Sequence, residues 1–201
     1  MPDAAMTTIQ PVLATPRLQL LPAHIGLARA MLDYQVRNRQ HFAAWDPKPG
    51  DMFFTELYWT MQLRQQALSW EQGRGARFLL TQPQQPQQPQ QIVGTVSLSN
   101  IVRGVFQAAH LGYGIDHTLQ GQGLMQEAVA EVIRFAFSDL RLHRLQANYQ
   151  PANARSAALL QRLGFVEEGL ARDYLYINGQ WRDHVLTSLT HAGFDPQQML
   201  A

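Results

Sequence analysis

A glycine-rich turn, QGQGLM from Gln120 to Met125, leads directly into a helical pattern. The first N–H groups of a helix lack intrahelical partners and lie at the positive end of the helix dipole, which makes such a turn a candidate anion site. Gly121 and Gly123 would let a pyrophosphate approach the backbone, because they carry no side chain. A dinucleotide-binding fingerprint would need a third glycine at Gln126, and a Walker loop would need Gly-Lys-Ser/Thr. A phosphate cradle and a plain structural turn remain as alternatives.

The helix after this turn has a pattern that would hold its first residues in place. Glu127, Glu131, Arg134 and Ser138 recur at three- and four-residue steps and form one narrow polar stripe. The other faces are largely apolar, which predicts that the helix packs on a sheet over most of its circumference. The apolar positions expected to be buried are Leu124, Val129, Val132, Ile133, Ala136 and Phe137.

Composition limits the class of protein. The 201 residues are 46% hydrophobic and 15% charged, with a formal net charge of +1 and no cysteine. This balance predicts one globular domain, 1–201, with no nucleic-acid-binding surface and no membrane association. The lack of cysteine excludes a cysteine nucleophile and thiolate metal ligands, and the scattered histidines predict no metal site. The first residues lack a secretory pattern, so we expect a cytoplasmic protein.

The hydrophobic pattern predicts a mixed α/β fold. Asn153 is suited to cap a short helix and Gly164 to end it, while Asn178 and Gly179 are typical of a tight hairpin turn. The expected elements are a strand at 17–22, helices at 25–36 and 55–72, strands at 76–81, 91–102 and 109–115, the helix after Gly123, a strand at 143–150, a helix at 153–163 and a hairpin at 170–190. We expect a central sheet of about seven strands with about four helices, antiparallel at both ends and with a parallel crossover near its middle. The segment between 38 and 51 and the Pro/Gln-rich segment 82–91 are expected to be loops, the latter without a chemical role.

Two sequence blocks resemble a known superfamily. QGQGLM resembles the Gln/Arg-x-x-Gly-x-Gly/Ala loop of the Gcn5-related N-acetyltransferases, with Met125 where a small residue is usual, and NARSAALLQRLGF from Asn153 to Phe165 resembles their second block. The resemblance covers 17–190. It implies the fold of that superfamily, with the sheet splayed in its middle, and acetyl-CoA as the co-substrate.

Further segments narrow the resemblance within the superfamily. WDP, SNIVRGVFQAAHLGYGI and DYLYINGQWRDHVLTSLT look most like the branch that acetylates the N-terminal alanine of a small-subunit ribosomal protein. This implies a protein N-terminus as the partner. Transfer to a small amine, such as an antibiotic or polyamine, is one alternative. A non-catalytic module that binds acyl-CoA or the ribosome is the other.

The resemblance also implies how acetyl-CoA is held. In this superfamily the acyl arm enters the gap between two diverging strands, here beside LGYGI, and the pyrophosphate sits at the glycine turn. An ordinary strand with a bend is the alternative for LGYGI. The residues implied to contact acetyl-CoA are Tyr113, Gly114, Ile115, Gln120, Gly121, Gln122, Gly123, Leu124, Met125 and Asn153.

The catalytic acid and base of many relatives are replaced in this chain. The position of their acidic tyrosine is Leu160, but Ser156 lies one helical turn earlier on the same face and can donate a proton, directly or through a water. Its alternative role is to complete the first helical turn with Asn153. The position of a glutamate base is Asn148, which cannot accept a proton. Asp173, acting through water, is then the catalytic candidate, with a solvated surface carboxylate as the alternative.

The absence of a strong base suits one kind of acceptor. A peptide α-amine titrates near ~7.7–8.0, so its deprotonation at pH 7 costs about 1–1.4 kcal/mol, against roughly 4.6 kcal/mol for a lysine side chain. For the acceptor pocket, Trp45 could wall a small first side chain and Asp46 could hold the ammonium group. Phe42, in the same segment, is expected to pack in the core.

Overall fold

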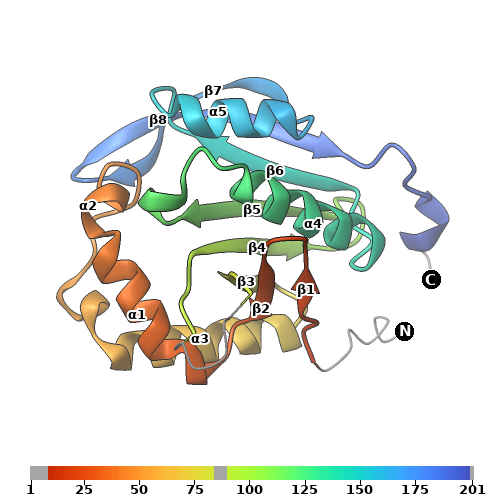
Figure 1. Ribbon diagram of the computed structural model, residues 1–201. Coiled ribbons are helices and arrows are strands. Elements are labelled where there is room, and N and C mark those ends of the chain that lie inside the picture. Colours follow the sequence, from red (N-terminus) through yellow and green to blue (C-terminus); the bar gives the residue numbers. More distant parts are fainter. Residues whose placement is uncertain (1–8, 84–89, 200–201) are drawn as a thin grey trace.

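The strands predicted from alternating patterns join into one sheet (Figure 1). The computed structural model describes residues 9–83 and 90–199, so most of the Pro/Gln-rich segment lies outside the described residues. The sheet has eight strands rather than about seven, because a two-residue strand pairs with the first predicted one. In the sheet order β1-β2-β3-β4-β5-β6-β8-β7, the strands are β1 (Leu13–Ala14), β2 (Gln19–Pro22), β3 (Ala76–Thr81), β4 (Gly94–Val102), β5 (Ala108–Ile115), β6 (Arg144–Tyr149), β8 (Gln180–Thr190) and β7 (Val166–Ile177).

The sheet is splayed between β5 and β6. These two strands form its parallel pair, whereas the other neighbours are antiparallel. Their ladder runs from Ala108 to His110, and no later pair joins them in the described sheet. β5 continues beside β4 as far as Ile115, and β6 continues beside β8 as far as Tyr149. The expected parallel crossover and the splay in the middle of the sheet are therefore confirmed.

The described residues also form five α-helices and four short 3-10 helices, the last of which follows the final strand. The helices are α1 (Ala28–Arg37), α2 (Arg39–Phe42), α3 (Glu56–Glu71), α4 (Leu124–Ser138), α5 (Ala154–Arg162), η1 (Ile25–Leu27), η2 (Asp51–Phe54), η3 (His117–Leu119) and η4 (Pro196–Met199). The segment after α1 was expected to be a loop, but it contains α2 and ends in η2. Tertiary contacts explain α2, because the ring of Phe42 packs against Tyr34 of α1 with centroids 5.4 Å apart. Among the described helices, none is long and apolar enough to cross a membrane.

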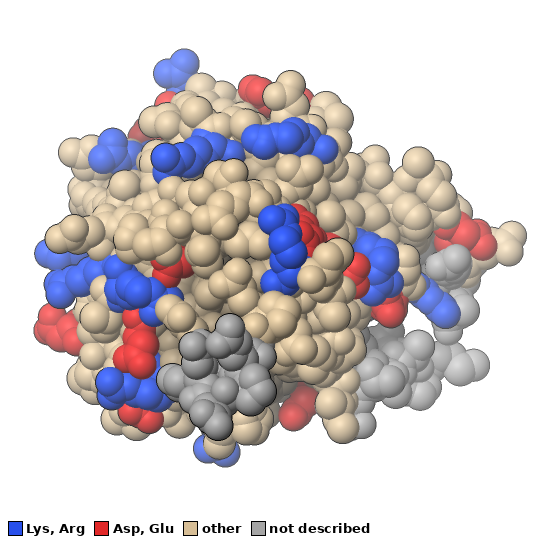
Figure 2. Space-filling view, in the orientation of Figure 1, with Lys and Arg blue, Asp and Glu red and all other residues tan. Residues whose placement is uncertain are grey.

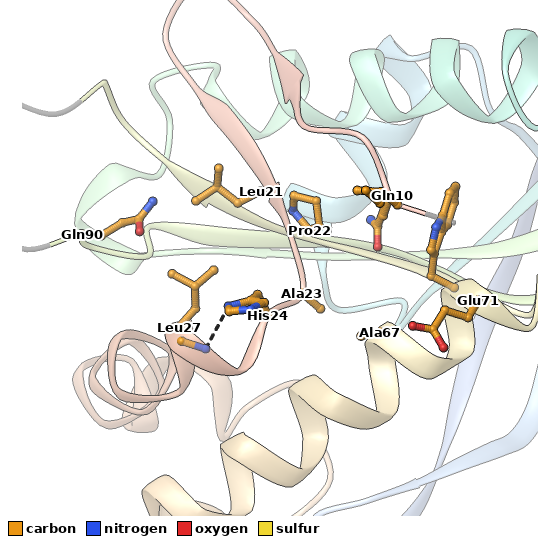
Figure 3. A pocket seen from close by; sticks show the side chains of 12 residues that line it. Gln10, Leu21, Pro22, Ala23, His24, Leu27, Ala67, Glu71 and Gln90 are labelled. Carbon is orange, nitrogen blue, oxygen red and sulfur yellow. Dashed lines mark hydrogen bonds between the residues drawn. The ribbon is translucent and has the colours of Figure 1, made fainter. Parts of the chain in front are cut away.

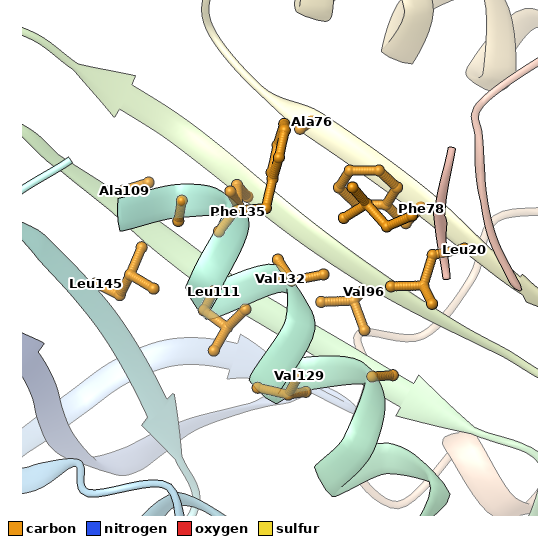
Figure 4. Close-up of a cluster of buried hydrophobic side chains, with 14 of the residues drawn as sticks. Leu20, Ala76, Phe78, Val96, Ala109, Leu111, Val129, Val132, Phe135 and Leu145 are labelled. Atoms are coloured by element: carbon orange, nitrogen blue, oxygen red, sulfur yellow. The ribbon is translucent and has the colours of Figure 1, made fainter. Parts of the chain in front are cut away.

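Helix α4 packs across the sheet as its sequence predicted (Figures 1 and 4). Its side chains point toward residues of β3, β4, β5 and β6, and Phe135 meets Phe78 edge to face with ring centroids 5.5 Å apart. Ile133 and Phe137, expected to be buried, are only partly buried, whereas Phe135 is the aromatic in the core. The buried residues of α4 are Leu124, Met125, Ala128, Val129, Val132, Phe135 and Ala136. This packing fixes the position of the helix start.

Helices α1 and α3 cover the opposite face of the sheet. In Figure 1, α4 passes in front of the strands, whereas α3 lies behind them at the lower edge. A second apolar cluster joins these helices to the sheet, including Met31 and Tyr34 of α1, Leu63 of α3 and Leu79 of β3. The splayed sheet therefore lies between two helical layers, and its central gap connects the two faces.

A buried ion pair ties α1 to the segment that enters the glycine turn. Asp116 follows β5 and is 2% exposed, and its Oδ2 lies 2.6 Å from Arg37 Nε. Asn38 Nδ2 donates to the same oxygen, and the N–H and hydroxyl of Thr118 donate to Oδ1. Burial alone would raise the pKa of this carboxyl, but the hydrogen bonds hold it well below its usual range. The approach to the glycine turn is thereby fixed against α1.

Candidate active site

The splay opens into a cavity of about 1090 Å³. Its wall is built from the end of β5, the glycine turn and the start of α4, the first turns of α5, and the helices α1 and α2 with Trp45 and Asp46 beyond them. A smaller hollow of about 610 Å³ lies between β2, η1 and α3 and is lined largely by apolar side chains such as Leu21, Ala23 and Leu27 (Figure 3). The described linings of the two hollows have no residue in common. The predicted chemistry therefore belongs to the larger cavity.

The glycine turn presents main-chain groups to this cavity. Gly123 is the N-cap of α4 with a left-handed φ of 77°, and Gly121 has a φ of 75°, conformations that strongly favour glycine. Leu124 and Met125 follow with their side chains in the core, at 2% and 8% exposure, so they present mainly backbone to the cavity. The first turn of α4 thus offers free N–H groups without a side chain in front of them, and this arrangement fits a pyrophosphate.

An arginine braces the turn from outside. Arg17 Nη1 donates to the carbonyl of Gln122 at 2.9 Å, and Arg17 Nε lies 2.7 Å from Glu127 Oε2. Burial would raise the pKa of the Glu127 carboxyl, but hydrogen bonds from Thr15 and Arg17 lower it. Gln122 donates its own side-chain amide to the carbonyl of Thr118 and is not among the described residues that line the cavity. Its position in the turn is therefore set by these contacts on the outer side.

Gln120 connects the turn to α2 and α5. Its Oε1 accepts a hydrogen bond from Arg155 Nη1, so its Nε2 donates to His41 Nε2, 2.8 Å away. The acceptor nitrogen of His41 must then be unprotonated. The pKa of His41 is lowered by partial burial and further by the neighbouring His117 and Arg155. The amide of Gln120 therefore bridges a cation and a neutral imidazole at the mouth of the cavity.

Two hydroxyl groups meet at the splay. Tyr113 of β5 and Ser156 of α5 place their side-chain oxygens 2.6 Å apart, and both residues line the cavity. Burial raises the pKa of Tyr113 to about 12, although the Ser156 hydrogen bond acts in the opposite direction. Gly114 and Ile115 continue the same wall. Because β6 has diverged, the edge of β5 is free of a strand partner here and can pair with a ligand.

The start of α5 explains how Ser156 can serve two roles. Asn153 is the N-cap, and its Oδ1 accepts a hydrogen bond from the backbone N–H of Ser156 at 3.1 Å. The predicted capping interaction therefore uses the main chain of Ser156 and leaves its hydroxyl for Tyr113. Leu160, one turn later, is 1% exposed and belongs to the core. Of the side chains on this face, Ser156 is the proton donor that reaches the cavity.

Asn148, at the position of the glutamate base, and the candidate Asp173 lie outside the described lining of the cavity. Asn148 Nδ2 donates to the hydroxyl of Tyr174 at 3.1 Å. Asp173 is exposed at an irregular point of β7, has a φ of 48°, and donates its backbone N–H to Asp183 Oδ1 at 2.9 Å. It is not among the described residues that line the cavity. The structure therefore places Asp173 at the surface and does not bring it together with Ser156 and Tyr113.

The expected acceptor residues lie in the segment that follows α2. Trp45 and Asp46 both line it, and so does Phe42, which also packs against the α1–α3 cluster. The Trp45 carbonyl accepts a hydrogen bond of 3.4 Å from Gln150, which ties this segment to the end of β6. Asp46 is exposed when the whole residue is considered. Desolvation of its carboxyl by the surrounding protein nevertheless raises the pKa, while Arg77 acts to lower it. The segment therefore offers an aromatic wall and one carboxylate.

Several lining residues were not predicted from the sequence. Tyr34, His41, Arg77 and Thr95 come from α1, α2, β3 and β4, where no motif marked them, and only the fold brings them to the gap. Arg155 and Arg162 add positive charge along α5. Figure 2 shows Lys and Arg side chains spread over the upper part of this face, where Figure 1 places α5, with a few acidic side chains among them. Among the described residues, no group of His, Cys, Asp and Glu could hold a metal ion.

The comparisons with known proteins agree with this geometry. A sequence model of the family described as "Acetyltransferase (GNAT) domain" matches residues 17–166. The chain therefore belongs to the GNAT acetyltransferase family, and it is an N-acetyltransferase.

Its similarity to particular members extends over nearly the whole chain. It is 41% identical over 184 residues to the [Ribosomal protein uS5]-alanine N-acetyltransferase of Escherichia coli K12, which covers 92% of this chain and 93% of that protein. The crystal structure of the ribosomal-protein-S5-alanine acetyltransferase from Vibrio fischeri superposes with a TM-score of 0.86 at 38% identity, covering 93% of this chain and all (100%) of the other. RimJ of Mycobacterium smegmatis, in complex with CoA-disulfide, gives a TM-score of 0.80 at 28% identity, covering 90% and 84%.

Proposed function

We propose that this protein transfers the acetyl group of acetyl-CoA to the α-amine of an N-terminal alanine in a small-subunit ribosomal protein, in the cytoplasm. The observation that carries the proposal is the nearly full-length similarity to the uS5-alanine N-acetyltransferase of Escherichia coli. The geometry supports it, because the anion-binding turn, the paired hydroxyls and the aromatic wall at Trp45 line one cavity.

The donor side of the cavity fits acetyl-CoA. The free N–H groups at the start of α4 suit the pyrophosphate, and Gly121 and Gly123 leave room for it. The unpaired edge of β5 at Gly114 suits the amide groups of the pantetheine arm. An N–H of this edge would also stabilise the negative charge that develops on the carbonyl oxygen during transfer.

Ser156 would supply the proton for the leaving group. The reaction forms a C–N bond and breaks the thioester C–S bond, so the amine loses one proton and the thiolate sulfur gains one. Ser156 Oγ would donate to the sulfur, and the hydroxyl of Tyr113 would donate to Ser156 as it does so. The raised pKa of Tyr113, about 12, keeps this phenol protonated at neutral pH.

The acceptor side suits an amine that needs little help to lose its proton. Among the described residues that line the cavity, Asp46 is the one carboxylate, whereas three arginines carry positive charge: Arg77, Arg155 and Arg162. A lining with more cations than acids disfavours a polyamine and other highly positive acceptors. An α-amine is neutral in a useful fraction of molecules at pH 7, so water can take its proton.

A peptide assay tests the proposal. The purified protein is mixed with acetyl-CoA and a peptide that begins with alanine and contains an internal lysine, and tandem mass spectrometry locates the acetyl group. We expect acetylation of the α-amine and none of the lysine. Aminoglycosides and spermidine form the comparison panel, and their turnover without peptide acetylation would favour the small-amine alternative. A thermal shift with acetyl-CoA but no thiol release from any acceptor would instead indicate a non-catalytic module.

A further inference from the structure

Two polar groups in the lining of the cavity have no hydrogen-bond partner among the described residues. Tyr34 is 1% exposed, and its buried hydroxyl makes no hydrogen bond to the described residues. Arg77 Nε is likewise buried without a partner, whereas Arg77 Nη2 donates to Thr95 Oγ1 at 3.1 Å. Burying a polar group without a hydrogen-bond partner is destabilising, and more so for a charged group. Both residues line the cavity, so a ligand there could supply the missing partner.

The strand register places these groups beside the splay. Arg77 lies opposite Ser97, and Ser97 lies opposite Gly112. Directly opposed residues of neighbouring strands share a face, so these three positions form one row across β3, β4 and β5. Phe78, the next residue, packs in the cluster with α4, whereas Leu79, two residues after Arg77, packs in the cluster with α1 and α3. Because alternate residues of a strand share a face, Arg77 lies on the face that α1 and α3 cover. The guanidinium thus lies on the face opposite to α4.

Tyr34 of α1 lies on the same face of the sheet as Arg77. A Cβ atom on Gly114 would lie 3.6 Å from the Tyr34 hydroxyl and 3.7 Å from the Phe42 ring. Gly114 is directly opposite Thr95, the residue that Arg77 contacts. Tyr34 and the Arg77–Thr95 pair therefore lie next to β5 at Gly114. At this point the edge of β5 that is turned away from β4 faces the gap between β5 and β6.

The chemistry of the two groups selects the ligand. A guanidinium is always a donor, and burial raises the pKa of Tyr34 far above neutrality, so its hydroxyl keeps its proton. Both groups can therefore donate a hydrogen bond to an acceptor oxygen. Asp46 lines the same cavity, and its carboxylate already offsets part of the positive charge of Arg77. This favours a neutral oxygen, such as a carbonyl, over a second carboxylate.

We propose that Tyr34 and Arg77 bind the carbonyl oxygen of the first peptide group of the acceptor, next to the amine that is acetylated. This inference rests on the proposed function, in which the N-terminus of a peptide enters the gap beside Gly114. The carbonyl carbon of the first residue is then only two bonds from the amine that is acetylated. The two residues then distinguish a peptide N-terminus from a simple alkylamine. They are positioning residues and take no part in proton transfer.

The test compares how fast the intact protein acetylates two acceptors. One is a peptide that begins with alanine, and the other carries an alkene in place of its first peptide bond and so lacks the carbonyl oxygen. Each is assayed with the wild type, Tyr34→Phe and Arg77→Met, and Arg77→Lys tests partial rescue. The matched controls are Tyr176→Phe and Arg74→Met, which alter exposed side chains outside the described lining. The ratio of kcat/KM for the two acceptors is compared between each variant and the wild type, because the different basicities of the two amines cancel in that comparison.

We expect the wild type to prefer the peptide by about 10–100-fold, and Tyr34→Phe and Arg77→Met each to reduce that preference by about tenfold. Tyr34→Phe should keep or raise Tm, because the hydroxyl it removes has no hydrogen-bond partner among the described residues, and acetyl-CoA affinity measured by calorimetry should not change. A wild type that acetylates both acceptors equally well, or variants that slow both by the same factor, would overturn the inference while the proposed function stands. A wild type that acetylates neither on its amine overturns the proposed function itself, and this inference with it.

Discussion

The side-chain oxygens of Tyr113 and Ser156 lie 2.6 Å apart, although one residue belongs to β5 and the other to α5. The contact forms where β5 parts from β6 and where Asn153 has already capped α5 through the backbone of Ser156. It joins the strand that would hold the acyl arm to the helix that would supply a proton. We propose that this hydroxyl pair, built from two elements, takes the place of the tyrosine acid that the family resemblance implies at the position of Leu160, which is buried in the core.

Ser156→Ala should lower kcat by about 10²-fold, because the leaving thiolate loses its proton donor. Tyr113→Phe should cost less, about tenfold, because Ser156 keeps its own proton and loses only the hydrogen bond from Tyr113. Acetyl-CoA affinity, measured by calorimetry, should be nearly unchanged in both. Ser138→Ala, at an exposed position of α4, is the control. An equal loss of kcat in a Leu160 substitution would assign the effect to packing of α5.

Gly123→Glu should raise the Kd for acetyl-CoA at least tenfold. The new carboxylate would stand where the pyrophosphate approaches the helix start, and its Cβ would lie 3.5 Å from Arg17 Nη2. Gly73→Glu is a matched control, since Gly73 also has a positive φ, of 66°, and open space around it, but lies outside the described lining of the cavity. Equal affinities of the wild type and Gly123→Glu in calorimetry would refute a cradle at this turn.

Trp45→Ala should relax selectivity for the first acceptor residue. Trp45 lines the cavity, and if it bounds the acceptor as we propose, its removal opens space for side chains larger than alanine. We expect KM for alanine peptides to rise and turnover of peptides with larger first residues to increase, with acetyl-CoA binding little changed. Trp181→Ala, at a residue 59% exposed on β8, should leave the selectivity profile as in the wild type. Identical profiles for all three proteins would remove Trp45 from the acceptor pocket.

The stability of the fold should fall on mild acidification because of His41. Its pKa is lowered in the folded protein, whereas the unfolded chain takes up the proton near the ordinary value of about 6.5. The folded state therefore binds fewer protons, so its stability is fully present above pH ~6.5 and decreases as the pH falls below it. In His41→Gln, Tm measured from pH 7.5 to 5.5 should fall less steeply than in the wild type. Parallel curves would show that His41 does not contribute.

Local rules predicted the parts of this fold that depend on neighbouring residues. The N-cap Asn153 and the positive φ of Gly164 are confirmed, and so is the tight turn at Asn178 and Gly179 between β7 and β8. The left-handed Gly123 at the start of α4 follows the same logic, since such a conformation strongly favours glycine.

The acceptor end of the cavity could not be predicted in this way. The alternation of β3 puts Arg77 on the face opposite to Phe78, but it does not show that Tyr34 covers it or that its Nε lacks a partner. Helix α2 was missed for a related reason, because the contact of Phe42 with Tyr34 joins it to α1. Local patterns likewise left Asp173 as a base candidate, whereas the course of β7 places it at the surface. Such features depend on contacts between segments far apart in the chain.

The most direct test of the account uses the natural kind of acceptor. Purified, unacetylated small-subunit ribosomal proteins are incubated with acetyl-CoA, with and without this protein, and their intact masses are compared. The account predicts that a protein with an N-terminal alanine gains the mass of one acetyl group less the hydrogen that it replaces, and that tandem spectra place the acetyl group on the α-amine. Unchanged masses for every small-subunit protein with an N-terminal alanine, or an acetyl group found only on lysine side chains, would contradict it.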